Sequence, residues 1–416
     1  MAEPLGTASL RRWRLRIFLL AWITYAVYYL GRVNLSVAVP AMSAEEGWNR
    51  AALGLVASTF YWCYAVGQLI NGQIGERLSA RRLVAVGLVA SALLNWLFGG
   101  MGALGAMLVV WGLNGFAQAT GWAPIMKTLA HWFEPRHRGR LTTFFAPCYV
   151  VGNSLSWALA GLMIAASGWR AAFRVPAGLL LAMAAIWYLL ARDAPPAPAP
   201  TGEVPARPAL LRGIASSLAA GWRTPRLRWG LVTCFLSGMV KDSLTLWGPT
   251  YLIETHGLAV STGALAASLI PVAGALGVAA AGWVLGARPV RHEAKVVTLL
   301  AGLMALAAGG LLLGMGRALP ATVALLGLLA AGSHGVNALL MTALPLSLGR
   351  EGQVSAAAGA LDFGSYVGGG LSVALIGGLQ LAIGWAGVYL WWLALAALMG
   401  GLAWWAGRRQ APAGGP

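Results

Sequence analysis

The chain has 416 residues, of which 59% are hydrophobic and only 10% are charged, whereas soluble globular proteins carry about 25% charged residues. This composition excludes a soluble globular protein and predicts an integral membrane protein with many spans. The net charge of +17 does not indicate a nucleic-acid partner, because the cations are spread over the short gaps between apolar segments.

Twelve apolar segments are long enough to cross a bilayer as helices, which predicts an all-α membrane protein with twelve transmembrane helices. The first segment is too long for the apolar core of a cleaved signal peptide, so we expect it to be retained as a span. The predicted spans are 17–40, 52–75, 83–101, 105–131, 142–166, 172–191, 229–252, 262–286, 296–315, 320–346, 355–379 and 384–406.

A stretch rich in proline and alanine, 193–208, interrupts this series after the sixth span and is typical of a linker. It is followed by apolar residues at helical spacing from Leu210 to Trp222, which predict a short helix on the membrane surface. We therefore divide the chain as follows: an N-terminal six-helix bundle, 1–191; a cytoplasmic linker with an interfacial helix, 192–228; and a C-terminal six-helix bundle, 229–416.

The distribution of cations predicts the orientation. Of the 29 lysines and arginines, 22 lie at the termini or in the gaps on one side of the predicted spans, four lie on the other side, and three lie within spans. Because cytoplasmic loops carry the excess of Lys and Arg, we expect both termini in the cytoplasm. We expect the membrane to be the bacterial cytoplasmic (inner) membrane.

The first span carries an arginine in a row of polar and aromatic residues. On a continuous helix, Tyr25, Tyr28, Tyr29, Arg32 and Ser36 share one face. Charged residues inside a membrane are expensive and mark functional sites, and a guanidinium fork matches two oxygens of a phosphate or carboxylate. Alternatively, the Arg32 side chain reaches toward the interface and has no ligand.

The two halves of the chain carry similar residues at matching positions. Arg32 precedes Pro40 by eight residues in the first span, and Lys241 precedes Pro249 by eight residues in the seventh. Parallel repeats of six spans are the build of major-facilitator transporters, whose substrate site lies near the midplane between the halves. We therefore expect Arg32 and Lys241 to face each other across a central cavity.

Four further ionisable residues lie within spans: Lys127, Asp242, Asp362 and His334. Asp362 and Lys127 are each seven residues from the cytoplasmic end of their spans, so we expect a gate pair between them when that side is closed. Alternatively, Lys127 snorkels to the inner surface and Asp362 stays neutral or bonds locally. His334 is either a packed, hydrogen-bonded side chain or a site for substrate or protons. Several amides are suited to the cavity or to bonds between helices: Asn71, Asn114, Gln118, Asn153 and Asn337.

We expect neither an enzyme nor a metal or cofactor site. The three cysteines lie within apolar segments without ligand spacing. The glycine-rich stretches lack the strand and the Lys-Ser/Thr ending of a nucleotide-binding loop. No set of nucleophile, base and orienting residue is visible.

Several stretches carry motifs of a known transporter family: Tyr25 to Pro40, 118–124 with 127–133, 247–252, and 356–370. They resemble the first, fourth, seventh and eleventh spans of the organophosphate:phosphate antiporter family of major-facilitator transporters. The resemblance implies a fold of two six-helix bundles.

By this resemblance, Arg32 holds the substrate phosphate, and Lys241 stands where the family carries an arginine or lysine. The chain departs from the family's glycerol-3-phosphate transporters, with Gln68 in place of a lysine and Tyr149 in place of a histidine. It also has His334 near a replaced Tyr-Gly-Pro element, and an additional acid, Asp362. These departures leave open a carboxylate ligand instead of a phosphate.

We therefore predict a secondary active transporter of a small anionic metabolite, an organophosphate, working by alternating access. The expected partners are that substrate, membrane lipid, and either counter-transported phosphate or a co-transported proton. Two alternatives are a proton-coupled symporter of a sugar acid or other carboxylate, and a transporter-like membrane sensor. The predicted substrate-binding residues are Arg32, Lys241, Tyr25, Tyr28, Tyr29, Gln68 and Tyr149; the predicted gating or coupling residues are Asp362, Lys127 and His334.

Overall fold

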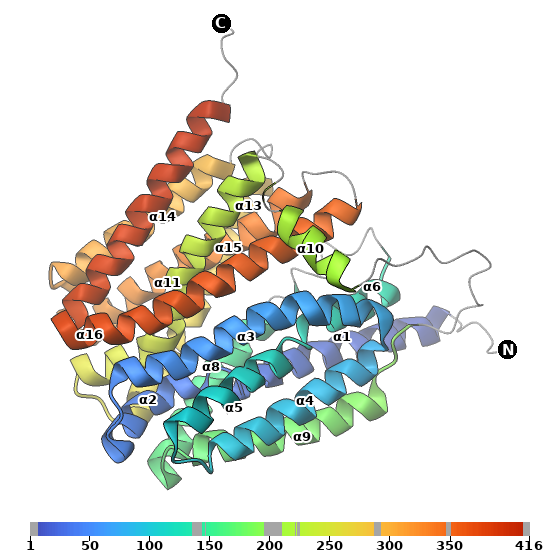
Figure 1. Cartoon of the computed structure of the whole chain (residues 1–416), viewed down its shortest axis with the longest axis horizontal. Coiled ribbons are helices and arrows are strands. Elements are labelled where there is room, and N and C mark those ends of the chain that lie inside the picture. The colour runs from blue at the N-terminus through green and yellow to red at the C-terminus, as the bar shows by residue number, and fades with distance from the viewer. Residues whose placement is uncertain are drawn as a thin grey trace, which may run out of the picture.

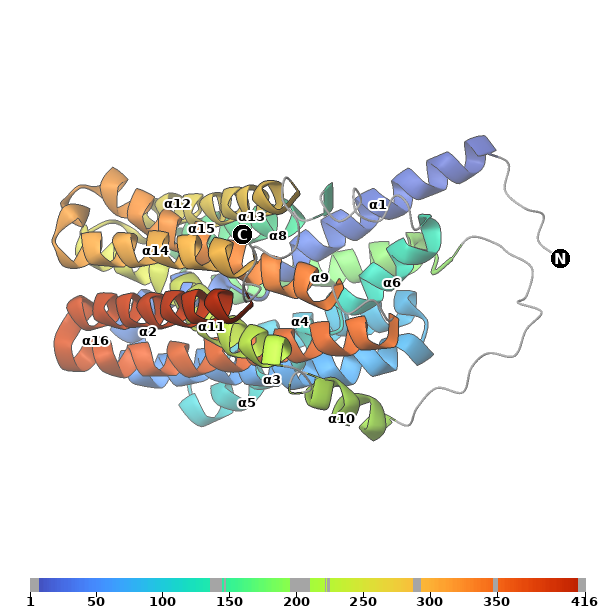
Figure 2. The same cartoon turned by 90° about the horizontal axis from the view of Figure 1, so that it is seen from above.

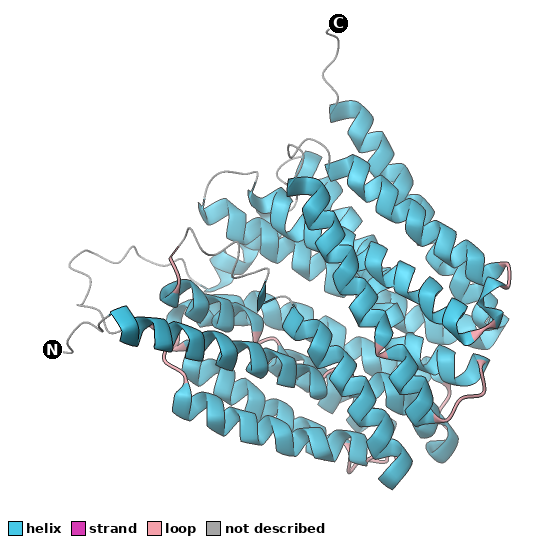
Figure 3. Cartoon of the chain, turned by 180° about the vertical axis from the view of Figure 1, so that it is seen from behind, coloured by secondary structure: helices cyan, strands magenta, loops and turns pink. Residues whose placement is uncertain are grey.

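The structure is a computed structural model, which describes residues 7–134, 144–145, 147–194, 210–220, 222, 225–286, 293–346 and 351–410. Within these ranges every regular element is a helix, and Figure 3 shows only helices and their connections. Residues 195–209, 221, 223 and 224 of the predicted linker lie outside the described residues. The boundaries of the two bundles therefore stay a prediction.

The N-terminal half contains six predicted spans, two of which are each built from two shorter helices. Its elements are α1 (Thr7–Leu30), α2 (Asn34–Glu46), α3 (Arg50–Arg77), α4 (Ala80–Phe98), α5 (Leu104–Gln118), α6 (Trp122–Trp132), α8 (Pro147–Ser167) and α9 (Ala171–Leu190). The first span combines α1 with α2, and the fourth combines α5 with α6.

The C-terminal half begins after α10 (Leu210–Ala220), which lies at the place of the predicted interfacial helix. Its elements are α11 (Pro225–Thr255), α12 (Val260–Ala267), α13 (Leu269–Gly286), α14 (Glu293–Leu312), η3 (Met315–Arg317), α15 (Leu319–Leu346) and α16 (Glu351–Gln410). The last of these reverses at Ile383 and Gly384, where Gly384 has φ +66°, so it supplies both the eleventh and the twelfth span.

Eight helices in the described ranges are long and apolar enough to cross a membrane, and the last of them, 357–408, includes both arms of α16. The predicted spans absent from this set are the first, fourth and seventh. These three contain Arg32, Lys127 and Lys241, the three cations that lie within predicted spans. Each of these three spans therefore carries a cation within an otherwise apolar segment, which lowers its mean hydropathy.

The helices form two groups that pack side by side (Figure 1). In the N-terminal group α4 packs on α9 and α3 on α5; in the C-terminal group α13 packs on α15 and α14 on α16. Contacts between the groups run from α3 to α16, from α8 to α12 and from α2 to α11. Figure 2 shows α1 and α6 reaching out together toward the N-terminus, where the rings of Trp13 and Trp132 stack with centroids 5.8 Å apart.

The two groups lie closest together at the end remote from both termini (Figure 1). There Arg50 of α3 forms an ion pair with Glu254 of α11. A Cβ atom on Gly377 of α16 would lie only 2.5 Å from the Arg50 carbonyl oxygen, so close backbone approach requires glycine. At the opposite end, α10 contacts both α3 and α16.

Candidate substrate-binding site

The first span is not the continuous helix that its spacing predicts. It breaks at 31–33, and Arg32 lies in the break. The Gly31 carbonyl, freed by the break, accepts hydrogen bonds from Asn95 Nδ2 at 3.2 Å and Asn114 Nδ2 at 2.9 Å. Non-helical backbone at membrane depth requires such partners, because an unsatisfied carbonyl in hydrocarbon is unfavourable. A side chain on Gly31 would collide with Leu180, since its Cβ would lie 2.6 Å from Leu180 Cδ1.

Arg32 is surrounded by aromatic and neutral polar groups. Its Nε donates to Gln118 Oε1 at 3.4 Å, and its Nη2 donates to the Tyr64 hydroxyl at 3.3 Å. The guanidinium carbon lies 4.6 Å from the ring centroids of both Tyr29 and Tyr64. Within the described part of the chain Arg32 forms no ion pair. A partly buried cation without an acidic partner is suited to receive an anion.

Lys241 lies in the middle of α11, which is not broken there. Its Nζ is 3.4 Å from Asp242 Oδ1, and the two side chains are 12% and 7% exposed. The Lys241 ammonium also lies 4.8 Å from the centroid of the Tyr366 ring. The other carboxylate oxygen of Asp242 is buried without a hydrogen-bond partner and packs against Gly369 of α16. The neighbouring acid therefore offsets much of the charge of Lys241.

Two tyrosines missed by the sequence analysis connect these cations. Tyr64 of α3 and Tyr366 of α16 have ring centroids 4.5 Å apart. Arg32 lies over Tyr64, and Lys241 lies over Tyr366. A pair of tyrosines, one from each half, thus lies between the two cations that are predicted to bind the substrate. Tyr61, Tyr64 and Gln68 follow one another at spacings of three and four in span two, a sequence signal from which this face could have been predicted.

The tyrosines of the first span have different surroundings. The ring of Tyr25 packs against Trp122 and Phe145, with centroid distances of 5.0 and 6.1 Å. The Tyr28 hydroxyl donates to the Val84 carbonyl at 3.0 Å and lies 3.2 Å from Thr120 Oγ1. Tyr28 is thereby committed to contacts inside the N-terminal half. Of the three, Tyr29 is the one whose ring lies against the Arg32 guanidinium.

The residues at which the chain departs from the antiporter pattern lie in contact networks. Gln68 Nε2 donates to the Tyr64 hydroxyl at 3.0 Å, one helical turn away in α3. The rings of Tyr149 in α8 and His334 in α15 stack across the two halves, with centroids 6.3 Å apart and planes at 8°. Tyr149, predicted to bind the substrate, and His334, predicted to act in gating or coupling, are therefore neighbours.

Lys127 and Asp362 do not form an ion pair within the described part of the chain. Lys127 Nζ donates to the Gly75 carbonyl at 2.6 Å, inside its own half. Asp362 lies one helical turn before Tyr366 in α16. Because the predicted pair belongs to a state in which the end that bears the termini is closed, it stays a prediction.

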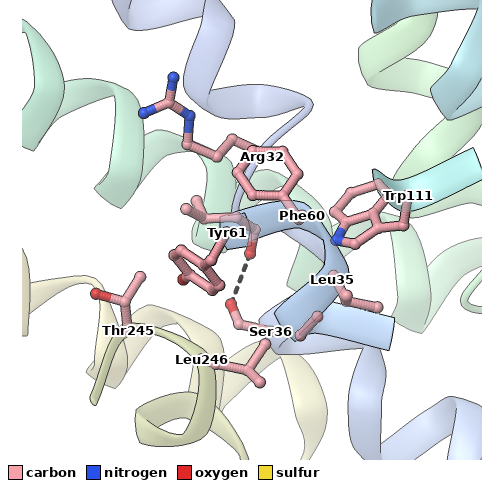
Figure 4. A pocket seen from close by; sticks show the side chains of 10 residues that line it. Arg32, Leu35, Ser36, Phe60, Tyr61, Trp111, Thr245 and Leu246 are labelled. Carbon is pink, nitrogen blue, oxygen red and sulfur yellow. Dashed lines mark hydrogen bonds between the residues drawn. The ribbon is translucent and has the colours of Figure 1, made fainter. Parts of the chain in front are cut away.

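A small pocket lies beside the break, between α2, α3 and α11 (Figure 4). Its lining is largely apolar: Val33, Leu35, Ala57, Phe60, Trp111 and Leu246, with Arg32, Ser36, Tyr61 and Thr245 as the polar members. Figure 4 shows the Arg32 guanidinium turned away from the aromatic side chains of this pocket. The Ser36 hydroxyl donates to the Val33 carbonyl at 2.6 Å, so it too is engaged locally. The charged end of Arg32 therefore acts outside this pocket.

The Major Facilitator Superfamily model matches residues 21–373, and the chain belongs to that family. The fold agrees with solved structures: a bacterial homolog of the human lysosomal transporter Spinster in its inward-facing, unoccupied conformation has a TM-score of 0.78 at 14% identity, covering 96% of this chain and 99% of that one. The nucleoside transporter NupG gives 0.66 at 15% identity, covering 97% and 100%. The predicted fold class is confirmed.

Sequence relatives include carriers of phosphorylated metabolites. A probable hexose phosphate transport protein of Chlamydia pneumoniae is 28% identical over 65% of this chain and 64% of its own length. The glycerol-3-phosphate transporter of Bacillus subtilis is 33% identical over 45% and 43%. The membrane sensor protein UhpC of Escherichia coli is 28% identical over 66% and 65%. The match thus spans under two thirds of the first relative's length. The chain is thus a member of the Major Facilitator Superfamily that is similar in sequence to proteins named as hexose phosphate and glycerol-3-phosphate transporters.

Proposed function

We propose that the chain carries an organic phosphate monoester across the bacterial cytoplasmic membrane by alternating access. The observation that carries this proposal is Arg32, a cation at a helix break for which the described residues provide no acid. Several secondary transporters bind anionic substrate groups at broken helices near the bilayer midplane. The named substrates of the relatives, hexose phosphate and glycerol 3-phosphate, are phosphate monoesters.

The groups around Arg32 complete an anion site. The Tyr64 hydroxyl accepts from both Arg32 Nη2 and Gln68 Nε2, so its own proton is available for donation to a substrate oxygen. Lys241 lies beyond the Tyr64–Tyr366 pair and supplies a second positive group from the other half. A phosphate held by Arg32 on one half and approached by Lys241 on the other would favour closure of the halves around it.

The described arrangement fits one step of this cycle. The halves are packed together at the end remote from the termini, and the Arg50–Glu254 ion pair joins them there. With both termini in the cytoplasm, as the cation distribution predicts, this is an inward-facing arrangement. A C-terminal reporter enzyme that is active only outside the cytoplasm should stay inactive; activity would contradict the orientation.

A second candidate function is proton-coupled symport of a carboxylate such as a sugar acid. It is favoured by the 3.4 Å approach of Asp242 to Lys241, which reduces the positive charge of the site. A singly charged carboxylate needs less positive charge than a phosphate dianion. A sensor that binds the anion without carrying it is a third candidate, favoured by the relatedness to membrane sensor proteins.

Uptake into proteoliposomes separates these functions. The purified protein would be reconstituted and offered labelled glucose 6-phosphate, glycerol 3-phosphate, 3-phosphoglycerate or glucuronate, with internal phosphate or with an inward proton gradient. We expect uptake of a phosphate monoester. Uptake of glucuronate alone, driven by the proton gradient, would favour the symporter instead. Binding of an anion without uptake under any gradient would favour the sensor.

A further inference from the structure

We infer that Gln118 is a positioning residue for Arg32: its side-chain amide fixes the rotation of the guanidinium so that one fork faces the substrate. This inference rests on the proposed anion site at Arg32 and identifies the residue that orients the Arg32 guanidinium in that site. Gln118 is the last residue of α5 and is fully buried. It lies next to the break at 119–121, which divides the fourth span as 31–33 divides the first.

The side-chain nitrogen of Gln118 is held by two hydrogen bonds. Its Nε2 donates to the Tyr28 carbonyl at 3.0 Å and to Ser91 Oγ at 2.8 Å. Because both amide hydrogens have acceptors, Oε1 is the atom turned toward Arg32 Nε. The orientation of the amide is therefore set by α1 and α4, independently of Arg32.

The hydrogen bonds divide the guanidinium into an edge used by the protein and an edge left for a ligand. Nε and Nη2 lie along one edge, and these atoms donate to Gln118 and Tyr64. The other fork consists of Nη1 and the second hydrogen of Nη2, and within the described part of the chain Nη1 has no hydrogen-bond partner. A guanidinium anchored in this way presents two parallel N–H groups, the geometry that matches two oxygens of one phosphate or carboxylate.

Asn114 provides a matched control one turn before Gln118. It is also fully buried, and it belongs to the same polar network: Nδ2 donates to the Gly31 carbonyl at 2.9 Å, and Oδ1 accepts from Ser91 Oγ at 2.7 Å. It supports the break without touching Arg32. Removal of the Asn114 amide therefore measures the contribution of the polar network to the structure. Removal of the Gln118 amide measures this contribution together with the effect on the orientation of the Arg32 guanidinium.

The test compares Gln118→Met with Asn114→Leu, which keep side-chain volume and remove the amides. Thermal stability and the dissociation constants of glucose 6-phosphate, glycerol 3-phosphate, 3-phosphoglycerate and glucuronate would be measured for the purified full-length protein. We expect both variants to melt at lower temperature than wild type. We expect Gln118→Met alone to weaken binding, by roughly tenfold or more, as for a lost hydrogen bond to a charged group. In transport it should raise KM more than it lowers the maximum rate.

Equal weakening of binding by the two variants, or no weakening by Gln118→Met, would overturn the positioning role. Binding of the carboxylate glucuronate distinguishes a failure of the positioning role from a failure of the proposed function. If wild type binds glucuronate and no phosphate ester, the proposed substrate class is wrong, while the contrast between the variants still tests the aim of Arg32. A wild-type protein that binds none of the four anions contradicts both proposals.

Discussion

At the residue scale, the two in-span cations with predicted substrate roles are stabilised in different ways. Arg32 is held by neutral hydrogen bonds and tyrosine rings, which leave its charge uncompensated. Lys241 has Asp242 beside it, 3.4 Å away, in a largely buried pair. Removal of one member of such a pair leaves an isolated buried charge, which is more destabilising than removal of both.

This difference predicts the effect of Lys241→Gln on stability. The single variant leaves Asp242 unpaired and should lose about 3 kcal/mol. The double variant with Asp242→Asn should recover most of the lost stability. The measurement is the apparent melting temperature of the detergent-solubilised proteins. A double variant less stable than the single one would show that the ion pair does not carry the effect.

At the element scale, the important departure from regular structure is the division of the first span into α1 and α2. The break places Arg32 outside regular helix and gives the Gly31 carbonyl to Asn95 and Asn114 instead of the next turn. Asn95 from α4 and Asn114 from α5 thus support the broken backbone, whereas Gln118 at the end of α5 contacts Arg32 itself.

Gly31→Ala tests whether this break is tightly packed. The added methyl group would meet Leu180 at 2.6 Å and Asn95 at 2.9 Å, so we expect a loss of about 1–3 kcal/mol from overpacking. Gly72→Ala is the matched control, because nothing lies within 4 Å of its Cβ position inside α3. Thermal unfolding should separate the two variants. Equal melting temperatures would mean that the break adapts freely.

Much of the fold follows from the sequence, because hydropathy fixes where helices cross a bilayer and the Arg32–Pro40 and Lys241–Pro249 spacing reveals the repeat. The break at 31–33 does not, because the freed Gly31 carbonyl is satisfied by Asn95 and Asn114 from other helices, which the sequence does not bring together. The same limit applies to the site. Arg32 and Lys241 were identifiable as charges in apolar segments, but the Tyr64–Tyr366 pair is created by packing of α3 on α16.

At the scale of the whole molecule, the two halves pack together at the end remote from the termini. Alternating access requires that the contacts at this end break when it opens. The Arg50–Glu254 ion pair is the charged contact between α3 and α11 at that end. Its side chains are 26% and 23% exposed, so its contribution is modest and screened by salt. A modest contact is suited to a transition that must reverse in each cycle.

Glu254→Gln should shift the population toward opening at this end. A cysteine at Thr245, which lines the pocket beside Arg32, would be introduced after replacement of Cys63, Cys148 and Cys234. We expect a membrane-impermeant thiol reagent, added at the end remote from the termini, to react roughly fivefold faster in Glu254→Gln, as for about 1 kcal/mol. Unchanged labelling would mean that packing alone, including Gly377 on Arg50, holds this end closed.

The predicted gate between Lys127 and Asp362 belongs to the opposite state of the cycle. In the described arrangement Lys127 donates to Gly75 within its own half. We expect Asp362→Asn and Lys127→Gln each to slow exchange, and the double variant to be little slower than either one. A double-mutant cycle on the transport rate measures this coupling. Strictly additive losses would show that the two residues act independently.

The central claim is that the Arg32 fork holds the substrate anion, and calorimetric titration tests it most directly. Wild type, Arg32→Lys and Arg32→Ala would be titrated with glucose 6-phosphate, with Arg174→Lys, an exposed arginine at the start of α9, as a control. We predict one bound anion per wild-type chain and an unchanged control. Arg32→Lys should bind at least roughly tenfold more weakly, because an ammonium cannot form the two parallel bonds, and Arg32→Ala should show no binding. Wild-type affinity in Arg32→Ala would contradict the account.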